Sequence, residues 1–198
     1  MKLSNKFTFV RVIFAPIFFL LYFLPVWTNR FALATTVIMI PLLLFAELTD
    51  YLDGKTARAH NEVSDFGKLF DPFADVVLHL TILLCLTLTG NMPSVLFVLL
   101  FYREFSMNFL RMIAAKSGTA IAARKGGKVK TVLYIFSGFF ALALVLCSRL
   151  GVEFGKSAAG GVKIASLVLF ILCAVASYAS FIDYLVHFVP ELKKKIDF

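Results

Sequence analysis

Long uncharged apolar runs alternate with short polar segments along the whole chain. The runs cover residues 12–29, 31–46, 76–102, 132–148 and 164–182. Each is close to or longer than the roughly 18 apolar residues that mark a membrane-spanning helix. The run at 76–102 is interrupted by Gly90-Asn91-Met92-Pro93, a turn sequence, so it predicts two spans.

The pattern therefore predicts an all-α integral membrane protein with six transmembrane helices in a single domain, residues 1–198. The expected helices cover residues 6–26, 31–58, 65–90, 93–116, 128–150 and 162–189. Lysines at 2 and 6 stand among apolar residues such as Phe7 and Phe9. This mixture predicts a short N-terminal juxtamembrane segment before the first span.

Charge then indicates how the helices are oriented. With the N-terminus in the cytoplasm, sixteen of the 20 lysines and arginines fall on the cytoplasmic side. By the positive-inside rule both termini are expected to be cytoplasmic. The net charge of +8 then sits mostly at that face, where it suits anionic headgroups or an anionic substrate better than nucleic acid.

One segment is unusually acidic for so apolar a chain: residues 50–75 read DYLDGKTARAHNEVSDFGKLFDPFAD. Asp50 and Asp53 are three residues apart and Asp71 and Asp75 are four apart, so each pair lies on one face of its helix. Four converging carboxylates repel unless cations lie among them, and Mg²⁺ and Mn²⁺ prefer such oxygen ligands. Two such ions would suit displacement at phosphorus. The alternative is a solvated loop in which the acids pair with Lys55, Arg58 and Lys68.

Small residues and one arginine accompany these acids. Gly54, Ala57 and Gly67 leave room for a base or a diphosphate, and Arg58 offers a planar fork of donors to phosphate. With the acids they form the spacing Asp50-x2-Asp53-Gly54-x2-Ala57-Arg58-x8-Gly67-x3-Asp71-x3-Asp75. In this spacing the sequence resembles the CDP-alcohol phosphotransferase family, a six-helix membrane fold.

The resemblance implies transfer of a phosphatidyl or similar group from a CDP-linked donor to an alcohol, with release of CMP. It implies that Asp50, Asp53 and Asp71 bind two Mg²⁺ or Mn²⁺ ions. Asp75 would lie close to a metal and serve as the base for the acceptor hydroxyl. The donor would lie against Gly54, Ala57, Arg58 and Gly67, and the protein would be a homodimer.

The second half of the chain bears on the choice of alcohol. Arg103 and Arg111 are eight residues apart and share a helical face, and Lys128 stands in a basic segment farther on. These positions, with the opening Asn5-x2-Thr8-x2-Arg11, resemble bacterial phosphatidylglycerophosphate synthases. The resemblance implies CDP-diacylglycerol as donor, glycerol 3-phosphate as acceptor and a site facing the cytoplasm at the bacterial inner membrane. The acceptor phosphate would then bind Arg103, Arg111 and Lys128.

Several alternatives stay open. Glu104 could neutralise Arg103 locally. Glu47, one turn before Asp50, could pair with a basic neighbour or support the metal site, and His79, one turn after Asp75, could pack or support the acids. The acceptor could instead be inositol phosphate, serine or phosphatidylglycerol. Outside this class, the acids could serve a divalent-cation transporter, although transport sites usually lie near the bilayer midplane on interrupted helices.

Overall fold

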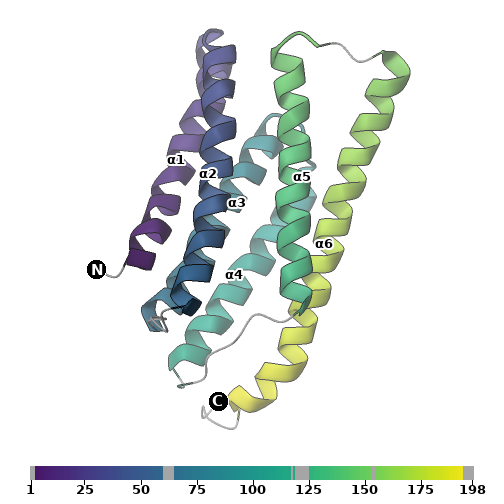
Figure 1. The fold of residues 1–198 in the computed structure, drawn as a ribbon. Helices are drawn as coiled ribbons and strands as arrows, with labels where there is room; N and C mark the ends of the chain where they lie inside the picture. The colour runs from purple at the N-terminus through teal and green to yellow at the C-terminus, as the bar shows by residue number, and fades with distance from the viewer. Residues whose placement is uncertain (1–2, 60–64, 117, 119–124, 153–154, 194–198) are drawn as a thin grey trace. The chain divides into compact units, whose positions relative to one another are not determined.

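The computed structural model describes residues 3–59, 65–116, 118, 125–152 and 155–193. In these residues it contains only helices, as the apolar pattern predicts (Figure 1). In chain order they are α1 (Leu3–Thr28), α2 (Ala32–Ala59), α3 (Asp65–Leu88), α4 (Ser94–Lys116), α5 (Lys125–Arg149) and α6 (Lys156–Lys193). The turn expected between the third and fourth helices is present, and its Gly90 has φ 75°, in the left-handed region that glycine adopts without strain.

The first residues of the chain belong to the same helix as the first span. Helix α1 runs from Leu3 to Thr28 without a break, and its apolar span begins at Thr8, so the short juxtamembrane segment stays a prediction. No glycine or proline precedes Pro16 in this helix, so no backbone feature separates the polar first turns from the apolar part. The same helix carries both.

Within the described residues, four helices contain a stretch that is apolar and long enough to cross a membrane: Thr8–Thr28, Leu69–Leu88, Val129–Arg149 and Ala159–Phe188. The described part of α2 offers a shorter apolar stretch, Ala32–Leu48, and α4 contains Arg103, Glu104 and Arg111. The charged residues of α2 and α4 shorten the apolar stretch that each of these two helices offers. Membrane passage of these two stays a prediction.

The chain divides into two compact units. One contains Met1–Thr89 and Ala143–Glu153, and the other contains Gly90–Leu142 and Phe154–Phe198. Helix α5 contributes its first turns to the second unit and its last turns to the first. The expectation of a single domain stays a prediction.

In the first unit α1 packs against both α2 and α3 (Figure 1). The face of α1 that makes this contact is a stripe at alternating spacings of three and four residues, buried at every position: Thr8, Arg11, Ala15, Phe18 and Tyr22. Such spacing places all five on one side of the helix. Alanines at 46 and 74 are fully buried on α2 and α3 and allow close helix approach. The stripe thus begins with two polar side chains, and their partners define the candidate site.

In the second unit α4 packs against α6. The buried face of α4 includes Leu100, Arg103, Glu104, Met107 and Ala114. Two charged side chains at the centre of a helix contact need internal partners, because uncompensated charge in an apolar interior is very unfavourable. Their partners come from α5 and α6, as described below.

Candidate active site

The predicted donor-side residues lie in the last turns of α2. Asp50, Asp53, Gly54, Ala57 and Arg58 all belong to this helix, and their side chains lie outside the described part of the structure. Because the backbone is helical here, Asp53 lies about 4.5 Å along the axis from Asp50. The three-residue spacing therefore corresponds to a little less than one helical turn of α2.

The other two acids belong to α3, one turn apart, and both contact α1. The Thr8 hydroxyl donates a hydrogen bond to Asp71 Oδ1, and Arg11 Nη1 donates to Asp75 Oδ1. Arg11 Nη2 also lies 3.9 Å from Asp71 Oδ1. A single turn of α1 thus supplies partners for both carboxylates.

The two sides of this cluster differ in exposure. Thr8 and Arg11 are 0% and 1% exposed, whereas the side chains of Asp71 and Asp75 are 45% and 35% exposed. The donors on α1 lie behind the acids, and the acids keep accessible surface. Gly67, one turn before Asp71, is buried, so this turn of α3 lies close to its neighbours.

A contact between α2 and α3 lies one helical turn from the acids. His79 Nε2 lies 3.0 Å from Glu47 Oε1. The two helices run in opposite directions (Figure 1), so the residues after Glu47 on α2 lie at the level of those before His79 on α3. Asp50 and Asp75 therefore lie on the same side of this contact. Glu47 and His79 pair with each other, one turn from the acids.

Divalent cations fit this set of donors by their chemistry. Carboxylate oxygens are the ligands that Mg²⁺ and Mn²⁺ prefer, and the two described carboxylates are both accessible. Among the described residues no group of three or more His, Cys, Asp or Glu side chains is close enough to hold a metal ion. The described part supplies two acids of the predicted four, Asp71 and Asp75.

In the second unit, buried charges converge on Glu104. Its Oε1 accepts hydrogen bonds from Arg103 Nη1 at 2.9 Å, from Lys130 Nζ at 2.7 Å and from the Tyr134 hydroxyl at 3.2 Å. Arg103 Nε donates to the Ser177 carbonyl oxygen at 3.0 Å. These bonds connect α4 to α5 and to α6. Glu104 thus neutralises Arg103, and also Lys130.

Arg111 is placed differently from Arg103. It is half-buried and lies near the Tyr184 hydroxyl. Its Nε is buried and has no hydrogen-bond partner among the described residues. A buried guanidinium nitrogen with an unfilled donor suits an anionic ligand. Lys128 lies in the first turn of α5, and its side chain is outside the described part.

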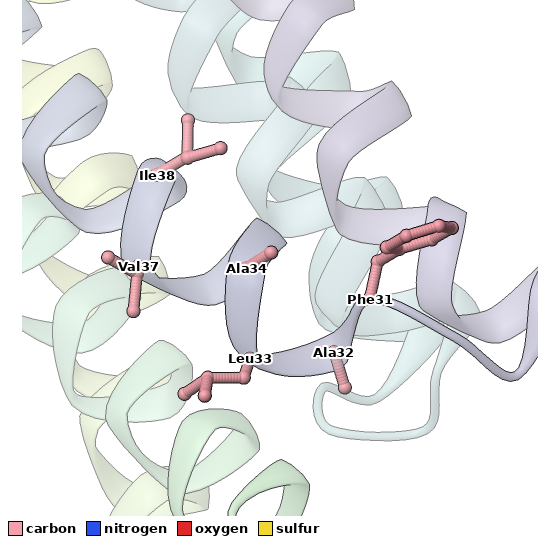
Figure 2. A pocket seen from close by; sticks show the side chains of 6 residues that line it. All are labelled: Phe31, Ala32, Leu33, Ala34, Val37 and Ile38. Carbon is pink, nitrogen blue, oxygen red and sulfur yellow. The ribbon is translucent and has the colours of Figure 1, made fainter.

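A hollow elsewhere on the first unit has unsuitable chemistry for phosphate. It lies at the start of α2, and Figure 2 shows the side chains that line it: Phe31, Ala32, Leu33, Ala34, Val37 and Ile38. All are apolar, and they belong to the opposite end of α2 from Asp50. A surface of this kind suits contact with lipid tails rather than with a diphosphate.

The sequence matches the CDP-alcohol phosphatidyltransferase family over residues 1–188. The chain belongs to this family. As a member, it shares 36% identity with the CDP-diacylglycerol–glycerol-3-phosphate 3-phosphatidyltransferase of Treponema pallidum (strain Nichols), over 98% of this chain and 92% of the relative. The protein of that name from Bacillus subtilis (strain 168) is 33% identical over 66% of this chain and 70% of its own length. A probable phosphatidylglycerophosphate synthase of Mycobacterium tuberculosis (strain ATCC 25618 / H37Rv) is 33% identical over 72% of this chain and 67% of its own.

Membership in the CDP-alcohol phosphatidyltransferase family confirms the resemblance indicated by the spacing of the eight signature residues from Asp50 to Asp75. Residue chemistry alone assigned no role to Thr8 and Arg11, although the motif that contains them was visible. Their position in the sequence could have identified them. The arginine follows the threonine by three residues, and the apolar residues after it continue the same helical face. A cation on the buried face of a span calls for an anionic partner. Lys130 and Tyr134 were missed as partners of Glu104, because their approach depends on helix packing.

Proposed function

We propose that this protein is a phosphatidylglycerophosphate synthase. It transfers the phosphatidyl group of CDP-diacylglycerol to glycerol 3-phosphate and yields phosphatidylglycerol phosphate and CMP. The observation that carries the proposal is the complete family signature, from Asp50 to Asp75, in a chain of the CDP-alcohol phosphatidyltransferase family. The choice of acceptor is supported by the names of its relatives, the first of which aligns with nearly the whole chain.

The acidic residues carry the proposed chemistry. Asp50, Asp53 and Asp71 bind two Mg²⁺ or Mn²⁺ ions, and Asp75 lies beside them. When bound, these ions supply positive charge that stabilises the diphosphate and the departing CMP. The proposal is supported by the accessible surface that Asp71 and Asp75 keep on α3. Gly54, Ala57, Arg58 and Gly67 hold the CDP group.

Asp75 acts as general base in the transfer. Its carboxylate takes the proton of the acceptor hydroxyl, because an alcohol is a poor nucleophile until that proton leaves. The acceptor oxygen then forms a bond to the phosphorus that carries the diacylglycerol. The bond between this phosphorus and the bridging oxygen breaks, and CMP leaves with that electron pair. The proton remains on Asp75 until solvent removes it.

Basic residues of the second unit recognise the acceptor phosphate. Arg111 is the best supported of the three candidates, because its buried Nε lacks a partner among the described side chains and backbone groups. Arg103 is already bonded to Glu104 and to the Ser177 carbonyl, so fewer of its five N–H donors remain for the phosphate. Lys128 adds positive charge at the start of α5.

The setting follows from the same reasoning. The apolar helices indicate a membrane protein, and we place it in the bacterial inner membrane with the acids at the cytoplasmic side. Six spans, cytoplasmic termini and a homodimer belong to the proposal. Accessibility of cysteines introduced near each terminus to a membrane-impermeant reagent tests the topology, and mass measurement in detergent tests the dimer.

The decisive experiment is CMP release by the purified protein in detergent. CDP-diacylglycerol is supplied with Mg²⁺ or Mn²⁺, and glycerol 3-phosphate, inositol phosphate, serine and phosphatidylglycerol are offered separately. We expect release with glycerol 3-phosphate and loss of release when EDTA removes the metal. Release only with another acceptor would refute the acceptor assignment. No release with any acceptor, from folded protein, would refute the function and favour a cation-flux assay.

A further inference from the structure

The buried polar residues of α1 suggest a role in the reaction that the family signature does not contain. Thr8 and Arg11 begin the buried stripe of α1, and each contacts one of the two described acids. Arg11 is 1% exposed, so its charge must be balanced inside the protein. Among the described side chains, the carboxylates of Asp75 and Asp71 contribute to this balance.

We propose that Thr8 and Arg11 are positioning residues that give Asp71 and Asp75 different tasks. The neutral Thr8 hydroxyl donates a hydrogen bond to Asp71, whereas Arg11 Nη2 lies 3.9 Å from this acid, beyond hydrogen-bond distance, which suits a metal ligand. A guanidinium on Asp75 competes directly with a metal ion for the same carboxylate. Arg11 thus restrains Asp75 from full coordination and keeps it available to the acceptor hydroxyl. This inference rests on the proposed function for the role of Asp75.

The exposure of the four side chains supports this division. Thr8 and Arg11 approach from the buried side, while both acids retain surface on the other side. Both contacts use Oδ1 of the acid, so α1 approaches the two carboxylates in the same way. Such second contacts commonly orient metal ligands and tune the site.

The two residues are therefore expected to have opposite effects on metal affinity. Arg11→Gln removes a positive charge beside the acids and should make Mn²⁺ binding about tenfold tighter. Its kcat should nevertheless fall at least about tenfold, because Asp75 is drawn onto the metal. Thr8→Val removes the bond that orients Asp71 and should weaken Mn²⁺ binding about threefold. Arg11→Lys keeps the charge, so Mn²⁺ affinity should stay within about twofold of wild type while kcat falls.

Mn²⁺ binding to the metal-free protein is measured by electron paramagnetic resonance without substrates, and CMP release is measured separately. Thr8→Ser should restore metal affinity, because it keeps the hydroxyl. Matched controls are Thr35→Val and Arg149→Gln, at a threonine that bonds the Phe31 carbonyl at 2.9 Å and an arginine that bonds the Tyr22 carbonyl at 2.6 Å. Neither control should change Mn²⁺ affinity.

Weaker or unchanged Mn²⁺ binding in Arg11→Gln would overturn the proposal, since a merely structural arginine would give that result. If Arg11→Gln does not fold, Arg11→Lys and Thr8→Val test the proposal instead. A wild-type kcat in both variants would overturn the proposal. The two proposals fail separately. Opposite shifts in Mn²⁺ affinity without CMP release from the wild type would refute the synthase function and leave the positioning of the acids standing.

Discussion

Each of the two units contains a cluster of paired charges, and the two clusters have opposite arrangements. In the first unit, one buried arginine contacts two carboxylates that are 45% and 35% exposed. In the second, one glutamate that is 4% exposed accepts bonds from an arginine and a lysine that are 3% and 15% exposed. The cation is central in the first cluster and the anion in the second.

Exposure distinguishes the two roles. Glu104 is surrounded by donors and has little surface for a ligand, so it acts as a connector between α4 and α5, while its partner Arg103 bonds α6. Asp71 and Asp75 have a donor behind them and accessible surface besides. For these two clusters, the accessible surface that remains after internal pairing therefore says more about function than the sign of the charge.

The largest effect is expected from a substitution in the exposed pair of acids, Asp71 and Asp75. Asp75→Asn keeps the shape of the side chain and removes the proposed base, so kcat for CMP release should fall by a factor on the order of 1,000 or more. Retained binding of the CDP donor in equilibrium measurements would show that the fold survives. CMP release at the wild-type rate would contradict the assignment of Asp75 as base.

Next in size is the removal of the buried connector. Glu104→Ala leaves Arg103 and Lys130 buried without their acid, which should lower the free energy of unfolding by about 3–5 kcal/mol. Thermal unfolding in detergent measures the loss. The control is Asp183→Ala in α6, whose pair with His187 is exposed and worth at most about 1 kcal/mol. Equal losses in the two variants would contradict the connector role.

Smaller effects are expected from substitutions of the two arginines of α4, and these effects should differ in kind. Arg111→Gln should raise KM for glycerol 3-phosphate by about tenfold to a hundredfold, as expected for loss of a charge-assisted hydrogen bond. Thermal stability should change little. Arg103→Gln should instead lower thermal stability, because it leaves Glu104 with fewer donors. Lys116→Gln at the exposed end of α4 serves as control. Exchange of the two phenotypes would assign the phosphate to Arg103.

The smallest effect concerns the contact between α2 and α3. Glu47→Gln keeps a hydrogen-bond acceptor for His79 and removes only the charge, so the free energy of unfolding should fall by less than about 1 kcal/mol. CMP release should stay within about threefold of wild type. Metal-dependent activity that disappears in Glu47→Gln would show that Glu47 belongs to the reaction rather than to the helix contact.

Much of this arrangement is visible in the amino-acid order. Apolar run length predicts the helices because a membrane span must satisfy its own backbone bonds. Spacings of three and four residues place Asp50 with Asp53 and Asp71 with Asp75 on common helical faces, because side-chain direction along a helix follows from its period. The residues of each short motif could therefore be grouped before any tertiary contact was known.

Only the tertiary structure decides which charges meet across helices. Arg11 and Asp75 are 64 positions apart, and Arg103 and Ser177 are 74 apart. Such pairs depend on how the helices rotate and slide against each other, which the burial of small and aromatic side chains determines jointly for all of them. The sequence by itself determines the helices and the local grouping of acids. Packing decides that Asp75 has an arginine behind it and that Arg103 is already paired with Glu104, because partner choice is a property of several helices at once.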